Sequence, residues 1–387
     1  MPVQVEHSVK KSTTLQGLDQ LRAFAITYVF VYHYHQSFGH PKWMENGANF
    51  GWTGVDLFFV LSGFLISREL FIRIASGRKI GLKSFIIKRF FRIIPPYLFV
   101  LLVYLAVPLS REGTNLSPLW KFFTFTLNFG LDWRQTDTFS HAWSLCVEEQ
   151  FYLILPLCIL LFLRLRAGKQ AAILIPVLLI LALFLRTWEW TTYIKPLMHS
   201  PELGPVWQTV IYYPTYNRLD PLLIGVTIAG LFTFYPDTQA FVNRYASIFL
   251  MSGIIVLLTA RYICKVGVSE LASVGGFPII AVGYGLIVAA AVCPAYLFFN
   301  LRSRLISGLA SFSYSIYLMH KMIIHLVQLE FSALGIDKNS NLILVISILG
   351  VIGAAFLMRI LVEKPAMQLR NKILNQNQNV KADLILN

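Results

Sequence analysis

The chain contains a series of apolar runs, each close to the length of a helix that crosses a membrane. Such a helix needs about 20 mostly apolar residues, because the hydrocarbon core is about 30 Å thick and a helix rises about 1.5 Å per residue. Charged residues make up only 13% of the 387 residues, about half the share in an average soluble chain. The predicted fold is therefore an all-α integral membrane bundle of about ten transmembrane helices, at residues 20–38, 53–74, 91–109, 142–163, 171–188, 217–235, 246–263, 274–298, 305–328 and 341–362.

The distribution of basic residues predicts how this bundle is oriented. The formal net charge is +14, and 22 of the 33 Lys and Arg residues fall in segments that are cytoplasmic if the N-terminus is inside. Basic residues collect on the cytoplasmic side of membrane proteins. We therefore expect both termini in the cytoplasm, and most of the positive charge is explained without nucleic acid.

A single membrane domain is expected between two short segments. The chain shows no internal repeat and no long hydrophilic region. The expected division is a cytoplasmic N-terminal segment at 1–16, a transmembrane domain at 17–366 and a cytoplasmic C-terminal tail at 367–387. The apolar run at 120–129 is too short to span and predicts an interfacial or re-entrant piece.

Several common kinds of site leave no signature in the sequence. There is no Walker loop, dinucleotide fingerprint, G-x-S-x-G elbow or H-E-x-x-H zinc motif. The four cysteines lie in or beside apolar runs without C-x-x-C spacing. Neither a metal site nor a disulfide framework is therefore expected.

The first apolar segment carries two ionisable groups in a useful register. Eleven residues separate Arg22 from His33, which is about 16 Å along a helix and close to three full turns. Both side chains therefore lie on nearly the same face. One helix points a fixed cation and a titratable imidazole into the same slot.

The expected topology places further polar groups at two depths. Ionisable side chains inside a membrane are costly, which makes them functional candidates by default. The outer half should hold His33 with Asp56, Glu148, Glu149 and His320. The inner face should hold Arg22, Lys88, Arg89 and Arg92.

This division suits group transfer from a phosphorylated donor in the cytoplasm. Arginines at the mouth of the slot offer charged, bidentate hydrogen bonds to phosphate, as in coenzyme A. A deep histidine suits general base or nucleophilic work, because the pKa of imidazole lies near neutrality and a carboxylate can fix its tautomer.

Six motifs in order along the chain resemble the membrane-bound acyltransferase 3 family. They cover nearly the whole chain, and six in series are far more specific than one. They are Leu18-Asp-Gln-Leu-Arg-Ala with His33, Gly54-Val-Asp-Leu-Phe-Phe-Val-Leu-Ser-Gly, Arg89-Phe-Phe-Arg92, Trp143-Ser-Leu-Cys-Val-Glu-Glu-Gln-Phe-Tyr, Ser313-Tyr-Ser-Ile-Tyr-Leu-Met-His and Glu363-Lys-Pro.

The resemblance implies a ten-helix enzyme of the cytoplasmic (inner) membrane. It would transfer an acyl group, often acetyl from acetyl-CoA, to a hydroxyl of a carbohydrate, lipid-linked glycan or natural product. It implies that His33 is the catalytic histidine and that Arg22, Arg89 and Arg92 bind the donor. The SGNH hydrolase-like domain fused to some relatives is not expected here. The bundle would bind the acceptor itself or pass the acyl group to a partner.

The resulting hypothesis assigns roles to the remaining candidates. His33, oriented by Glu148 or Glu149, either deprotonates the acceptor hydroxyl or carries the acyl group. Ser62 or His320 would stabilise the oxyanion. Asp56 and Tyr317 are expected to contact substrate.

Simpler interpretations stay open at this point. Arg89 and Arg92 lie in an expected cytoplasmic loop that topology alone would make basic. His33 and Tyr317 could be helix-packing residues. The whole chain could also be a transporter of an acyl donor or lipid-linked sugar, although the paired helix breaks typical of inverted repeats are not evident.

Overall fold

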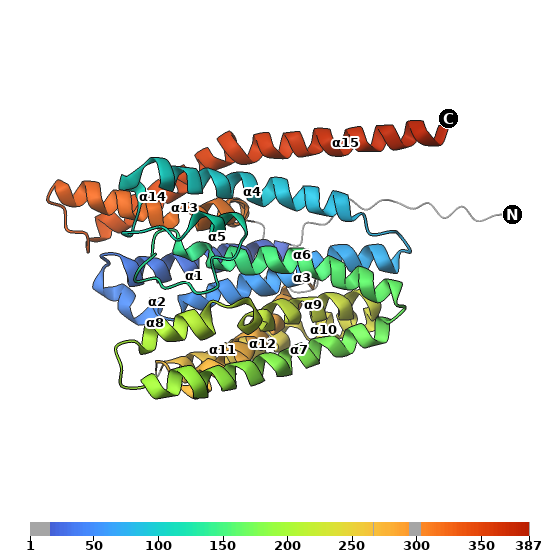
Figure 1. Ribbon diagram of the computed structural model, residues 1–387, viewed down its shortest axis with the longest axis horizontal. Helices are drawn as coiled ribbons and strands as arrows, with labels where there is room; N and C mark the ends of the chain where they lie inside the picture. Colours follow the sequence, from blue (N-terminus) through green and yellow to red (C-terminus); the bar gives the residue numbers. More distant parts are fainter. Residues whose placement is uncertain (1–15, 266, 294–302, 387) are drawn as a thin grey trace.

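The computed structural model describes residues 16–265, 267–293 and 303–386, which form a bundle of long helices (Figure 1). No β-strand occurs within these ranges. A helix covers most of each of the ten expected segments, because each is a run of Leu, Ile, Val and Phe that hydrogen-bonds internally in an apolar medium. These helices are α1 (Gln16–Ser37), α3 (Gly54–Ala75), α4 (Leu82–Ala106), α6 (Trp143–Arg164), α7 (Gly168–Glu189), α9 (Leu219–Phe234), α11 (Ala246–Cys264), α12 (Gly276–Ala291), α13 (Arg304–Ala333) and α14 (Asn341–Met358).

Shorter helices occupy the connections. The run at 120–129, predicted to be too short to span, contains only the five-residue helix α5. Among the described residues, the four short α-helices are α2 (Glu45–Ala48), α5 (Leu119–Phe123), α8 (Leu203–Trp207) and α10 (Pro236–Arg244).

The structure confirms an all-helical, multi-pass membrane protein. Among the described residues, five helices are long and apolar enough to cross a membrane, or six if the bent pair α9 and α10 forms one span. In Figure 1 the connections from α3 to α4 and from α6 to α7 lie at the right end, and those from α7 to α8 and from α13 to α14 lie at the left end. This alternation agrees with the expected topology. The number of ten spans and the side that faces the cytoplasm remain predictions.

The start of α4 corrects one expectation about the donor-site residues. The apolar run predicts a helix from about residue 91, with Arg89 and Arg92 in the cytoplasmic loop before it. Helix α4 instead begins at Leu82, so both arginines lie well inside it. Lys and Arg disfavour burial in lipid, but they are good helix formers. The helix therefore continues beyond the apolar stretch, and it fixes the direction of both guanidinium groups.

The C-terminal residues, for which the sequence predicted no secondary structure, form a helix. Helix α14 continues through a short π-helical turn, Arg359–Glu363, into α15 (Lys364–Leu386). Helix α15 packs alongside α4 and runs toward the right end of Figure 1. Most of the segment predicted as a tail is therefore helical.

Helices α1 and α3 form the centre of the bundle. Side chains from both contribute to the two largest buried apolar clusters, one shared with α4, α6 and α13 and the other with α9, α11 and α12. Gly63 of α3 and Gly225 of α9 let these two helices approach closely, because a methyl group at either position would collide with backbone atoms of the other helix. We call the helices around the first cluster the first half of the bundle and the helices around the second cluster the second half. The candidate site lies in the first half.

Candidate active site

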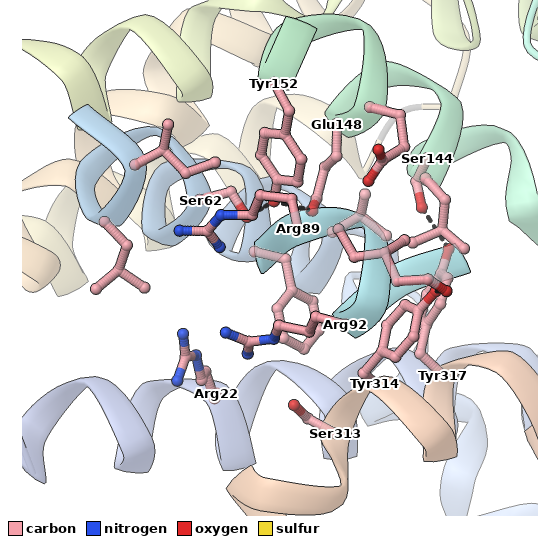
Figure 2. Close-up of a pocket in the computed structure, with 17 residues that line it drawn as sticks. Arg22, Ser62, Arg89, Arg92, Ser144, Glu148, Tyr152, Ser313, Tyr314 and Tyr317 are labelled. Atoms are coloured by element: carbon pink, nitrogen blue, oxygen red, sulfur yellow. Dashed lines mark hydrogen bonds between the residues drawn. The ribbon is translucent and has the colours of Figure 1, made fainter. Parts of the chain in front are cut away.

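A cavity of about 110 Å³ lies among five helices of the first half (Figure 2). Its walls come from α1, α3, α4, α6 and α13, which are distant in sequence. Most residues expected to bind donor or acceptor meet here. The polar side chains that line it are Arg22, Ser62, Arg89, Arg92, Ser144, Glu148, Glu149, Tyr152, Ser313, Tyr314 and Tyr317.

Three arginines point into this cavity from two helices (Figure 2). Arg22 on α1 lies 3.6 Å from the Asp19 carboxylate, and the Arg89 Nη2 atom lies 3.2 Å from Glu69. Arg92 is exposed to the cavity and has no hydrogen-bond partner among the described residues. The predicted convergence of these three residues is what the structure shows. Their charges are only partly balanced, which favours an anionic ligand.

Both candidate glutamates line the same cavity as the arginines. The Tyr152 hydroxyl donates to Glu148 Oε2 over 2.6 Å, and its oxygen lies 3.0 Å from Ser62 Oγ. Glu149 also lines the wall. The sequence left open which glutamate faces the slot, and the structure places both there. Within the described part of the chain, neither glutamate hydrogen-bonds to His33.

Tyr317 connects the cavity to a group of histidines. Its hydroxyl donates to the His141 carbonyl over 2.7 Å and lies 2.6 Å from Ser144 Oγ. Since the Tyr317 proton goes to the carbonyl, the Ser144 hydroxyl must donate to Tyr317. Tyr317 therefore has the cavity on one side and His141 on the other.

Two predicted histidines form a direct pair beyond Tyr317. His33 Nδ1 and His320 Nε2 are 2.9 Å apart. His320 Nδ1 faces the carbonyl oxygen of Tyr317 at 2.8 Å, so this nitrogen carries the proton and Nε2 is the acceptor. His33 Nδ1 must then donate, which leaves the lone pair on His33 Nε2. This is the form that a nucleophile or general base needs.

The orientation of His33 therefore comes from a group that the sequence assigned elsewhere. The sequence predicts that Glu148 or Glu149 orients this ring, whereas in the structure the ring hydrogen-bonds to His320. His320 uses both ring nitrogens in this arrangement, so it has no hydrogen left for an oxyanion. Among the two predicted oxyanion donors, only Ser62 lines the cavity.

Asp56 lies outside the cavity lining. It is fully buried, and its Oδ1 accepts a hydrogen bond of 2.8 Å from Arg218 Nη2. The Arg218 guanidinium also lies over the rings of Tyr212 and Phe277, at 4.8 and 4.4 Å from their centroids. A role for Asp56 in contacting substrate stays a prediction.

Three residues around the histidine pair were not singled out from the sequence. The His141 ring centroid lies 5.0 Å from that of His320 and 6.1 Å from that of His33. Lys321 Nζ lies 3.4 Å from Glu112 Oε1. His141 could have been found, because it precedes Trp143 at the depth of the other histidines. Glu112 lies in a long connection, where nothing in the sequence indicates its partner.

No metal centre is evident from these side chains. Within the described part of the chain, no group of three or more His, Cys, Asp or Glu side chains is arranged to hold a metal ion. The three histidine rings are held instead by hydrogen bonds to each other and to backbone carbonyls.

The helices and this cavity define a multi-pass membrane protein. Its polar cavity is lined by three arginines, and a group of histidines lies beyond the cavity wall at Tyr317. The chain belongs to the Acyltransferase domain family, which matches residues 15–360. It is similar to the O-acetyltransferase OatA of Staphylococcus aureus, with 31% identity over 328 residues, covering 80% of this chain and 50% of that protein. It is also similar to the peptidoglycan O-acetyltransferase OatA of Listeria monocytogenes, with 28% identity over 327 residues, covering 80% of this chain and 49% of that protein.

The chain spans about half the length of these relatives. No solved structure matches it.

Proposed function

We propose that this protein is a membrane O-acyltransferase that moves an acyl group, acetyl in the first instance, from acyl-CoA to a hydroxyl of a glycan or small-molecule acceptor. One observation carries the proposal: three arginines converge in a cavity whose wall, at Tyr317, adjoins the His33 and His320 pair. The membership of the acyltransferase family and the names of the relatives support it.

Acyl-CoA is the donor that the cavity suits best. Its phosphates would contact Arg22, Arg89 and Arg92, because guanidinium groups bind phosphate through paired, charged hydrogen bonds. Arg92 is the strongest candidate, since it is exposed to the cavity and lacks a partner among the described residues. The thioester would then extend past Tyr317 toward His33.

His33 would act through its unprotonated Nε2 atom. In direct transfer, Nε2 takes the proton of the acceptor hydroxyl, the oxygen bonds to the acyl carbon, the C–S bond breaks and the thiolate receives the proton. In the two-step route, Nε2 bonds to the acyl carbon and the thiolate leaves with the electron pair. The acceptor oxygen then bonds to the acyl carbon, the C–N bond to Nε2 breaks, and the hydroxyl proton passes to the coenzyme A thiolate. His320 orients His33 in both routes. Ser62 is proposed to stabilise the oxyanion, for which its rotatable hydroxyl turns away from Tyr152.

The acceptor is proposed to be a hydroxyl on a glycan. The Listeria relative is named for peptidoglycan, which makes peptidoglycan fragments the first acceptors to test. We place the protein in the cytoplasmic membrane, with both termini inside and residues 17–366 as the catalytic domain. The donor would then bind from the cytoplasmic end.

The test is transfer by the purified protein. We expect labelled acetyl-CoA and glycan acceptors to give released coenzyme A and an acceptor heavier by one acetyl group. His33→Ala should lower kcat by about 10²- to 10⁴-fold, the usual share of a general base. His35→Ala is the matched control, since His35 contacts His40 and Asn49 and lies outside the cavity.

Two results would overturn the proposal. One is full acyl transfer by His33→Ala. The other is movement of the acyl donor or a lipid-linked sugar across vesicle membranes by the wild type without any acylated product, which would favour the transporter.

A further inference from the structure

A buried ion pair lies behind the histidines and outside the cavity lining. The side chains of Glu112 and Lys321 are 3% and 8% exposed, and Glu112 Oε1 lies 3.4 Å from Lys321 Nζ. The same oxygen lies 4.0 Å from His141 Nδ1. The mechanism above uses none of these three side chains.

One carboxylate oxygen ties two parts of the histidine group together. Glu112 Oε1 accepts a hydrogen bond of 3.1 Å from the Phe139 backbone N–H, two residues before His141. Lys321 directly follows His320 on α13. Glu112 therefore holds the segment of His141 against the helix of His320.

The pair is incompletely satisfied, which makes a purely structural role expensive. Glu112 Oε2 and His141 Nδ1 are both buried and make no hydrogen bond of good geometry with the described residues, and the hydroxyl of Tyr104, also buried and unpaired, is the polar group nearest to hand for Glu112. A buried ion pair with unmet hydrogen bonds is seldom more stable than apolar side chains of the same size. A charged lysine at this position would, without Glu112, act directly on the neighbouring imidazoles.

The chemistry at His33 makes that charge important. In either route of acyl transfer, the His33 and His320 pair carries a positive charge for part of the reaction. An unbalanced ammonium group nearby would raise the energy of that state. The contacts from Lys321 through Glu112 and His141 to His33 measure 3.4 Å, 4.0 Å and, between ring centroids, 6.1 Å.

We propose that Glu112 and Lys321 are a positioning pair for acyl transfer: the carboxylate cancels the lysine charge beside the histidines and allows positive charge to form on His33. The inference rests on the proposed function, since it assumes that His33 acts on an acyl group. It assigns the pair to the chemical step and leaves donor binding to the arginines.

The charge role is tested by removing the carboxylate charge while keeping its shape. Glu112→Gln retains an oxygen for the Phe139 N–H but leaves Lys321 unbalanced. We expect kcat to fall about 10-fold, because the unbalanced ammonium repels the positive charge that forms on the histidine pair, while KM for acetyl-CoA stays unchanged. Glu202→Gln makes the same chemical change on an exposed loop and should behave as the wild type.

A double variant separates charge balance from a structural tie. In Glu112→Gln with Lys321→Met, the unbalanced lysine charge is gone, although residues 112 and 321 are still no longer joined by an ion pair. Most of the lost kcat should therefore return. A single variant with wild-type kcat would overturn the pairing role. The pairing role would also be overturned if the double variant were as slow as Glu112→Gln alone and its unfolding temperature were equally lowered. That result is expected if the ion pair only holds the two segments together.

The same assay distinguishes this inference from the proposed function. Wild type and His33→Ala are measured beside the Glu112 variants. Active wild type with unaffected Glu112→Gln refutes the pairing role alone. Wild type that acylates no acceptor refutes acyl transfer and the pairing role with it.

Discussion

Arginine occurs in two contrasting regions of this bundle. In the cavity, the Arg22 and Arg89 side chains are 25% and 20% exposed, and Arg92 is exposed. Between α7 and α9, by contrast, Arg186 is completely buried and binds both carboxylate oxygens of Asp220, at 2.5 and 3.2 Å. Arg186 also donates to the Asn217 carbonyl over 2.9 Å.

This difference separates arginines that hold the fold from arginines that await a ligand. Arg186 has exchanged water for a fixed carboxylate, so its binding capacity is largely used within the protein. The cavity arginines keep contact with solvent. Arg89 has one ion pair of 3.2 Å with a partly exposed carboxylate, Arg22 has one of 3.6 Å, and Arg92 has none among the described residues. Removing a partner should therefore affect stability at Arg186, whereas removing a cavity arginine should affect binding.

The largest effect is expected from breaking the buried pair. Asp220→Asn keeps the shape of the side chain but leaves the Arg186 charge unbalanced in the interior. We expect the free energy of unfolding to fall by about 3–5 kcal/mol, measured by denaturant unfolding of the purified protein in detergent. Asp237→Asn, on the exposed part of α10, should leave it unchanged. Equal stability of the two variants would show that the buried pair contributes little.

A smaller effect, on a different quantity, is expected in the cavity. Arg92→Gln should raise KM for acetyl-CoA about 10- to 100-fold, because a hydrogen bond to a charged group contributes about 1.5–3 kcal/mol. The free energy of unfolding should hardly change. Lys83→Gln is the matched control, since Lys83 lies on the same helix outside the cavity lining. An unchanged KM in Arg92→Gln would remove Arg92 from the donor site.

Much of the fold followed from apolar runs, because a membrane requires long helices with few charges. The failures have the same cause. Hydropathy ends a predicted helix where charges begin, although α4 continues through Lys83, Arg89 and Arg92 as a regular helix. The helical segment after Glu363 was missed for a similar reason, since its polar residues gave no membrane signal.

Within the site, spacing along one helix was informative and contacts between helices were not. The register of Arg22 and His33 on α1 was predictable from the helical period. The hydrogen bond between His33 and His320 joins residues 287 positions apart, and only packing decides it. The pair Arg186 and Asp220 left a clue, since opposite charges occur at the same depth on consecutive membrane segments.

The smallest effect is expected from a third kind of arginine, in the connections between helices. Arg134 contacts Asp132 at 3.2 Å and Glu202 at 2.9 Å, and all three side chains are partly exposed. Hydrogen bonds from Arg134 hold the pKa of both Asp132 and Glu202 below their usual values. A carboxylate with a lowered pKa stabilises the fold above its unfolded pKa, and that contribution disappears as the pH falls through its folded value.

The sign of the pH dependence follows directly. Arg134→Gln should lower the unfolding temperature slightly near pH 7, far less than Asp220→Asn, because water and salt screen exposed pairs. The difference from wild type should begin to shrink near pH about 4, the usual range of free carboxyl groups, and vanish at lower pH, where both carboxylates are protonated. Added salt should also reduce it. A difference that persists at low pH would mean that Arg134 acts through packing, and the contrast with Arg186 would then rest on burial alone.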